Sequence, residues 1–231
     1  MKAVIADSPS LARWQLADAL AFAEDHEIPC DVITTAELQN RAYARNDSSR
    51  CYHCKDELFS AMETYAASTD LSKIAYGVNL DDLKDFRPGQ QAARKHQVIA
   101  PLAEAGLSKA EIRELAKAAG LRISQKPASP CLASRIEYGR PVTLEALAVI
   151  EKGEDALRSL GFREFRVRHH GDIVRIEVAR EELYRALDPA MAAEFTRTFK
   201  ALGFTYVTLD LEGFRSGSMN AVLPLALLKR Q

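Results

Sequence analysis

The chain has 231 residues, 47% of them hydrophobic, and its 31 basic and 32 acidic residues leave a formal net charge of -1. This length suffices for one large domain or two small ones, and the balanced charge excludes the positive field that draws a protein to nucleic acid or an acidic membrane. No apolar run approaches the roughly 18 residues of a membrane span and no secretory signal pattern is visible, so we expect a cytoplasmic protein with neither nucleic acid nor membrane as a partner.

The first part of the chain alternates between predicted strands and predicted helices. The strands cover residues 3–6 (AVIA), 30–34 (CDVIT) and 73–79 (KIAYGVN), and the helices cover residues 11–27, 56–69 and 107–120. The last of these helices has a capping box, Ser108 with Glu111, and ends at Gly120. Strand and helix in turn predict an α/β fold for residues 1–138, with a parallel sheet covered by helices on both faces.

The order of elements changes after residue 138. A helix is predicted over residues 144–160, closed by Gly161, and a β-hairpin over residues 164–178, where EFRVRHHGDIVRIEV alternates around a central His-Gly-Asp. A helical region and a strand at residues 205–211 (TYVTLDL) follow. We therefore predict a smaller C-terminal α+β domain, residues 139–231, for substrate binding or oligomerisation.

Four cysteines occur, Cys30, Cys51, Cys54 and Cys131, and in a reducing compartment they are expected to be thiols or metal ligands. The CxxC spacing of Cys51 and Cys54 lets both sulfurs face one metal or cluster. A redox dithiol is an alternative because a predicted helix follows directly, and a pair of partly buried thiols is another. No second CxxC is present, although His53 could complete a mixed site. Cys30 is expected to be a packing residue.

Cys131 lies in KPASPCLASRIEYGRP, residues 126–141. Three prolines in this segment exclude a regular helix or a central strand, so Cys131 is predicted to lie on a shaped loop, where functional residues concentrate. Lys126 and Arg135 would favour its thiolate if they face it. A cysteine packed into the junction between the two domains is the alternative.

Six segments in the same order carry a resemblance to a known family. They are RCYHCKDELF, GVNLDDLKDFRPG, PLAEAGLSKAEIREL, KPASPCLASRIEYG, LGFREFRVRHHGDIVRIEV and LGFTYVTLDLEGFRSGSMN. They are distributed over residues 50–220, and on them the chain closely resembles the LarE-type ATP-dependent sulfurtransferases of the PP-loop ATP pyrophosphatase superfamily. The resemblance implies a role in building the nickel-pincer nucleotide cofactor and a closed homo-oligomer. It also implies contacts with other proteins of cofactor biosynthesis.

For the fold, the resemblance implies an adenine nucleotide alpha hydrolase-like domain of the PP-loop type. For the reaction, it implies that ATP with Mg²⁺ adenylates a carboxylate of pyridinium-3,5-biscarboxylic acid mononucleotide, after which sulfur is installed. The residue that matches the family's sulfur-handling cysteine is Cys131. The family has two sulfur sources: either this cysteine gives up its own sulfur and becomes dehydroalanine, or three cysteines hold a [4Fe-4S] cluster that carries external sulfide. Because Cys51 and Cys54 accompany Cys131, the cluster is favoured here and the sacrificial cysteine is the alternative.

The resemblance also implies residues that bind the anionic substrate. Arg166 and Arg168 lie two apart on a predicted strand, so their side chains leave the same face and can meet phosphate or carboxylate groups. The other implied substrate-binding residues are Ser134, Arg135, Arg215, Ser216 and Ser218, and the implied nucleotide-binding residues are Asn79, Asp81 and Asp82. Glu154 and Glu177 lie in matched segments, but we expect them to be exposed carboxylates.

The superfamily's phosphate loop, a Ser-Gly-Gly-x-Asp-Ser run, does not occur in residues 1–76, because the first glycine of the chain is Gly77. We therefore expect a PP-loop domain that lacks its first strand and phosphate loop, and weak ATP binding. Two other functions stay open. One is a non-catalytic module that binds the cluster or the substrate, and the other is a thiol oxidoreductase that uses Cys51 and Cys54.

Overall fold

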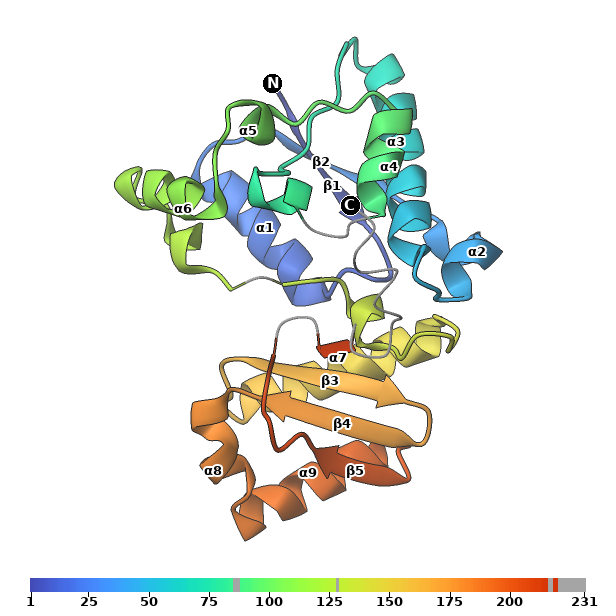
Figure 1. Cartoon of the computed structure of the whole chain (residues 1–231), viewed down its shortest axis with the longest axis vertical. Helices are drawn as coiled ribbons and strands as arrows, with labels where there is room; N and C mark the ends of the chain where they lie inside the picture. Colours follow the sequence, from blue (N-terminus) through green and yellow to red (C-terminus); the bar gives the residue numbers. More distant parts are fainter. Residues whose placement is uncertain (85–87, 128, 216–217, 220–231) are drawn as a thin grey trace.

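The structure is a computed structural model that describes residues 1–84, 88–127, 129–215 and 218–219. Its elements form two groups, one above the other in Figure 1: β1, β2 and helices α1 to α6 lie in the upper group, and α7 to α9 with strands β3 to β5 lie in the lower group. The fold is therefore mixed α/β, with one parallel sheet and one separate mixed sheet. Among the described helices, none is long and apolar enough to cross a membrane.

The upper sheet confirms the first two predicted strands. Strand β1 (Ala3–Asp7) pairs in parallel with β2 (Cys30–Thr34), and α1 (Arg13–Asp25) connects them. The strand predicted at residues 73–79 is wrong. Ala75 forms only an isolated bridge to Ile99, held by a hydrogen bond from the Tyr76 amide to the Ile99 carbonyl (3.1 Å). An apolar run without an extended partner does not build a strand, because pairing supplies the hydrogen bonds.

Short helices and one long helix complete the upper group. They are η1 (Glu37–Gln39), α2 (Arg41–Ala44), α3 (Arg50–Ser68), η2 (Asp81–Lys84), α4 (Gly89–Lys95), α5 (Pro101–Glu104), α6 (Lys109–Ala118), η3 (Arg122–Gln125) and η4 (Leu132–Arg135). The predicted capping box begins α6: the Ser108 side chain accepts from the Glu111 amide, and the Glu111 carboxylate accepts from the Ser108 amide. The chain then turns at Gly120, whose φ of +71° suits glycine.

The lower group confirms the predicted helix, hairpin and final strand. Helix α7 (Leu144–Ser159) precedes β3 (Phe165–His170) and β4 (Ile173–Val178), which pair antiparallel, and β5 (Tyr206–Leu209) pairs in parallel with β4. The helical region consists of η5 (Arg180–Glu182), α8 (Leu183–Ala186) and α9 (Pro189–Ala201). Gly171 makes the hairpin turn with a φ of +73°, a conformation that costs glycine little.

The larger hydrophobic core lies between α7, α9 and the lower sheet, and it extends into the upper group. Leu132, Ala133 and Ile136 from η4 and its end pack in the same cluster as Val167 and Phe199. A smaller cluster around Phe59 joins α3 to α4. The domain boundary at residue 138 stays a prediction, and the loop of Cys131 is anchored to the core on the C-terminal side of that boundary.

A buried histidine joins α4 to α3, the helix that carries the CxxC motif. His96 contacts Asp56 through Nε2 and Glu63 through Nδ1, both at 2.9 Å. Burial by itself lowers the pKa of His96, but hydrogen bonds to the two carboxylates outweigh it and raise the pKa above its ordinary value. The charged imidazolium therefore stabilises the contact between the two helices.

His96→Gln is expected to remove a pH-dependent part of the stability. Because the pKa is raised in the folded chain, this stabilisation is fully present below the ordinary pKa of about 6.5 and is lost as pH rises through the raised folded value. Urea unfolding at several pH values should show the largest difference between wild type and variant in acid. The exposed His26 supplies the control, His26→Gln. A difference that is the same at every pH would contradict the charged-histidine account.

Candidate functional site

Cys131 lies in the loop that precedes η4, as predicted, and its backbone is extended (φ -61°, ψ 155°). The side chain is half-buried and packs against the larger core. The Leu132 amide donates to the Ser10 carbonyl (2.8 Å), and the Ser134 hydroxyl donates to the Cys131 carbonyl (2.7 Å). These bonds tie the loop to the start of α1 and to η4, so the sulfur has a defined place.

The CxxC motif opens helix α3. Cys51 is exposed and Cys54 is half-buried against the larger core, and all four cysteines are free thiols. The two sulfurs are separated by about one helical turn, so they lie on one side of the helix. Backbone N–H groups at the start of a helix favour negative charge, which suits thiolate ligands.

Arg50 is a buried cation close to the cysteines, and the sequence analysis did not identify it. It is 5% exposed, and its Nη1 donates to the Asn46 side chain and to the Ala133 carbonyl (2.9 Å). Burial by itself lowers the pKa of Arg50, but the neighbouring Cys131 and Cys51 raise it, and the net direction is upward. Its position directly before Cys51 is the signal in the sequence that could have identified it.

Lys126 and Arg135, which were expected to face the thiolate, have carboxylate partners instead. The Lys126 ammonium pairs with Asp18 (2.5 Å), and the Arg135 guanidinium pairs with Glu154 through Nε (2.8 Å). Arg135 is 1% exposed, so the structure places it inside the protein, behind the loop. The expectation that Glu154 is exposed was wrong, because only a buried carboxylate can balance a buried guanidinium.

Burial dominates the electrostatics of Cys54. It raises the pKa of the Cys54 thiol to about 12, with further contributions from Cys131 and from Glu37. Glu37 is 1% exposed and accepts a hydrogen bond from Ser8, and its Oε2 has no hydrogen-bond partner among the described residues. Cys54 is therefore a thiol at neutral pH, and a metal would have to displace its proton.

Cys54 is expected to react with iodoacetamide about 100-fold more slowly at pH 8 than an ordinary cysteine with a pKa near 8.5, because so little of it is thiolate. Peptide mass spectrometry after timed alkylation measures this rate, with the half-buried Cys30 of the same chain as the internal reference. In denaturant the two rates should converge. Equal rates in the folded chain would show that the thiol is not protected by burial.

The three cysteines of the expected cluster share one neighbourhood. Cys51 and Cys131 are close enough to raise the pKa of Arg50, and both also raise the pKa of Cys54. Within the described residues, no three His, Cys, Asp or Glu side chains form a group that could hold a metal ion. Three thiols are the donor set that binds iron–sulfur clusters, but the three side chains are not gathered around one point in this structure, so holding a cluster would require them to move together.

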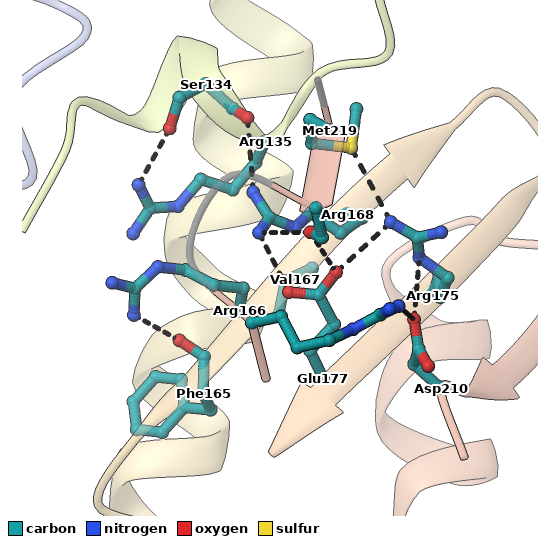
Figure 2. A network of polar contacts seen from close by, with 12 residues as sticks. Ser134, Arg135, Phe165, Arg166, Val167, Arg168, Arg175, Glu177, Asp210 and Met219 are labelled. Carbon is teal, nitrogen blue, oxygen red and sulfur yellow. Dashed lines mark hydrogen bonds and ion pairs between the residues drawn. The ribbon is translucent and has the colours of Figure 1, made fainter. Parts of the chain in front are cut away.

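A second buried ion pair lies next to the loop and is shown in Figure 2. Arg168 Nη2 donates to Glu177 Oε2 (2.8 Å) and to the Ser218 hydroxyl (3.0 Å), and Arg168 Nη1 donates to the Ser134 carbonyl (3.3 Å). Glu177 is completely buried and also accepts from Ser218 (2.8 Å) and Arg175 (3.1 Å), so the expectation of an exposed carboxylate was wrong here too. Three predicted substrate-binding residues, Ser134, Arg168 and Ser218, thus meet.

Arg166 lies on β3, as Arg168 does, but its guanidinium contacts other groups. Its Nη1 donates to the Phe165 carbonyl (2.5 Å), and its guanidinium lies 4.6 Å from the centre of the Phe214 ring. Burial and the neighbouring Arg135 lower the pKa of Arg166 to about 10, so it is charged at neutral pH. It lines a cavity of about 550 Å³ between α1, the segment after α6 and the lower group. The lining includes Trp14, Arg122, Lys126, Arg158, Phe165 and Arg166. The carboxylates of Asp18, Glu154 and Glu164 also line it, and Asp18 pairs with Lys126. The remaining cations and the rings suit an aromatic anion.

The remaining predicted site residues lie elsewhere. Arg215 is half-exposed and pairs with Glu212 (2.7 Å), and Ser216 lies outside the described residues. Asn79, Asp81 and Asp82 form a local turn: the Asn79 side chain accepts from the amides of Asp81 (3.0 Å) and Asp82 (3.1 Å). The turn is bonded to its neighbours in the upper group: the Lys109 amide donates to the Asp81 side chain (2.8 Å), and the Gln90 side chain donates to the Asp82 carbonyl (2.6 Å).

Three known proteins are similar to this chain over 90% or more of its length. No family model matches it. An uncharacterized protein of Synechocystis is 41% identical over 221 residues, 96% of this chain and 82% of the relative, and an uncharacterized protein of Methanocaldococcus jannaschii is 29% identical over 209 residues, 90% and 79% of the two chains. The pyridinium-3,5-bisthiocarboxylic acid mononucleotide synthase of Lactiplantibacillus plantarum is 34% identical over 226 residues, 98% of this chain and 81% of the synthase. The chain therefore belongs to the LarE family of such synthases.

Proposed function

We propose that this chain is an enzyme that inserts sulfur into an adenylated carboxylate of pyridinium-3,5-biscarboxylic acid mononucleotide, in the biosynthesis of the nickel-pincer nucleotide cofactor. The observation that carries the proposal is the meeting of the Cys131 loop with the polar cluster of Ser134, Arg168 and Ser218. The loop that carries the sulfur atom is thereby hydrogen-bonded to a strand arginine and, through it, to a serine, residue types that suit an anion. The name of the relative from Lactiplantibacillus plantarum supports the same reaction.

The substrate is a mononucleotide with a phosphate and carboxylates, so its recognition needs fixed cations. Arg166 is charged and lines the cavity of about 550 Å³, whose other edge is formed by the loop through Ser129 and Arg135. We place the phosphate end of the substrate in this cavity, because guanidinium groups bind phosphate through paired hydrogen bonds. Ser129 of this lining lies two residues before Cys131, and we propose that the reacting carboxylate lies on that side of the cavity.

The chemistry follows from the leaving group. A carboxylate is a poor electrophile until ATP with Mg²⁺ converts it to an acyl adenylate, and Asn79, Asp81 and Asp82 are our candidates for the nucleotide side. The Cys131 thiolate attacks the carbonyl carbon, a carbon–sulfur bond forms, and AMP leaves with the electron pair of the broken C–O bond. A base then removes the Cα proton of Cys131 and the Cα=Cβ bond of dehydroalanine forms, while the Cβ–Sγ bond breaks and its electron pair leaves with the sulfur as the thiocarboxylate.

Cys51, Cys54 and Cys131 would hold a [4Fe-4S] cluster, which when bound supplies a site for external sulfide and spares the protein sulfur. Arg50 would balance the negative charge of the thiolates from inside the protein. Loading would release the Cys54 proton, since this thiol is protonated at neutral pH.

The test supplies the chain with either the biscarboxylic mononucleotide plus ATP and Mg²⁺ or the preformed acyl adenylate. Mass spectrometry follows the replacement of one carboxylate oxygen by sulfur, with iron and acid-labile sulfide measured on protein prepared without oxygen. Product from the adenylate supports the proposal, and about four irons per chain support the cluster as the source. If the substrate binds but neither form reacts, the chain is a non-catalytic binding module.

A further inference from the structure

The guanidinium of Arg135 is occupied by protein groups on every side. Nε and Nη2 donate to the two carboxylate oxygens of Glu154 (2.8 and 3.1 Å). Nη1 donates to the carbonyls of Pro130 (2.6 Å) and Cys131 (3.1 Å) and to the Ser134 hydroxyl (3.0 Å). Because the side chain is 1% exposed, it holds the backbone on both sides of the sulfur and does not present itself to solvent.

Glu154 connects this clamp to strand β3. Its Oε1 also accepts from the Val167 amide (3.3 Å), which lies between Arg166 and Arg168 in the strand. The close approach of α7 to β3 depends on Gly153: a Cβ there would lie 3.3 Å from the Val167 side chain and 2.7 Å from Phe199. A backbone without a side chain thus lets the carboxylate reach the strand.

The chain after Arg135 is attached to the same strand. Ile136 forms a parallel bridge with His169, and the Glu137 amide donates to the His169 carbonyl (3.2 Å). The loop of Cys131 is therefore joined to β3 at two places, through the clamp and through this bridge. Its position relative to the strand arginines is set by contacts inside the protein.

Stability alone does not account for a charged pair at this depth, because an apolar pair of similar volume is often as stabilising or more so. The pair does offer fixed hydrogen bonds to two loop carbonyls and one strand amide, which apolar side chains lack. We propose that Arg135 and Glu154 are positioning residues, which fix the Cys131 sulfur relative to Arg166 and Arg168 without touching the substrate. The inference rests on the proposed function for its catalytic consequence, while the geometry of the sulfur is testable without it.

Arg135→Lys is the sharpest test, because lysine keeps the charge next to Glu154 but lacks the fork that reaches both loop carbonyls. We expect kcat for sulfur transfer to fall about 100-fold with KM within about twofold, as for a misplaced reacting group. The rate of Cys131 alkylation by iodoacetamide should change by about fivefold or more, with the Cys30 rate of the same chain unchanged. Glu154→Gln, which keeps the side-chain volume, should reproduce both effects.

Arg197→Lys is the matched control, since Arg197 pairs with Glu194 on the exposed face of α9. A raised KM with unchanged kcat in Arg135→Lys would overturn the proposal and make Arg135 a substrate ligand. Unchanged Cys131 alkylation in both folded variants would overturn it as well. If the wild type transfers no sulfur, the proposed function fails, and the alkylation rates still decide whether the pair positions the sulfur. Should Arg135→Lys not fold, Glu154→Gln carries the same comparison.

Discussion

Cys131→Ala is expected to lower sulfur transfer by at least about 1,000-fold, because the variant has lost the atom that attacks the acyl adenylate. The loss is expected with either sulfur source, since Cys131 is also one of the three proposed cluster ligands. The fold should survive: the side chain is half-buried and makes no capping hydrogen bond to η4. Product formation from the preformed adenylate measures the effect.

Cys30→Ala is the matched control for this variant, because Cys30 is also half-buried but lies in β2, among the upper strands. It should transfer sulfur at the rate of the wild type. Iron content separates the two sulfur sources in the Cys131 variant. Iron lost together with activity points to the cluster, and a wild type without iron that reacts once per chain points to the sacrificial cysteine. Full activity in Cys131→Ala would contradict both.

Glu177→Gln is expected to lower the free energy of unfolding by about 3–5 kcal/mol, because it leaves the buried guanidinium of Arg168 without its balancing charge. Glu177 is completely buried, and the Arg168 side chain is 6% exposed. Urea denaturation measures the change, and an unchanged slope with denaturant shows that the folded state is as compact as before.

Two further variants sharpen this result. Glu212→Gln removes the exposed partner of Arg215 and should cost less than about 1 kcal/mol, as solvent-exposed ion pairs do. The double variant Glu177→Leu with Arg168→Met should recover much of the stability, because it removes both buried charges together. It should not recover substrate binding if Arg168 contacts the anion. A small loss in Glu177→Gln would show that the pair is more solvated than its burial indicates.

Most of the helices and strands could be predicted from local sequence patterns. The alternation of β3 and β4 around Gly171, the capping box of α6 and the apolar period of α7 depend on neighbours within a few residues, so they were predicted correctly. The segment at residues 73–79 was not, because its composition suits a strand but strand formation depends on a partner from elsewhere in the chain. The CxxC pair and the loop of Cys131 were also identified from the sequence alone.

Which charges are buried was decided only by the tertiary structure. Glu154 and Glu177 have the spacing of ordinary helix and strand carboxylates, and nothing nearby in the sequence shows that Arg135 and Arg168 meet them inside the protein. Arg50 is likewise held close to the cysteines by a contact between α3 and η4, in which its guanidinium donates to the Ala133 carbonyl. Burial and ion pairing depend on contacts between segments far apart in the chain, whereas helix caps, turns and apolar periods are local. The sequence by itself therefore determined the elements and the reactive cysteines, and the tertiary structure determined which arginines can reach an anion.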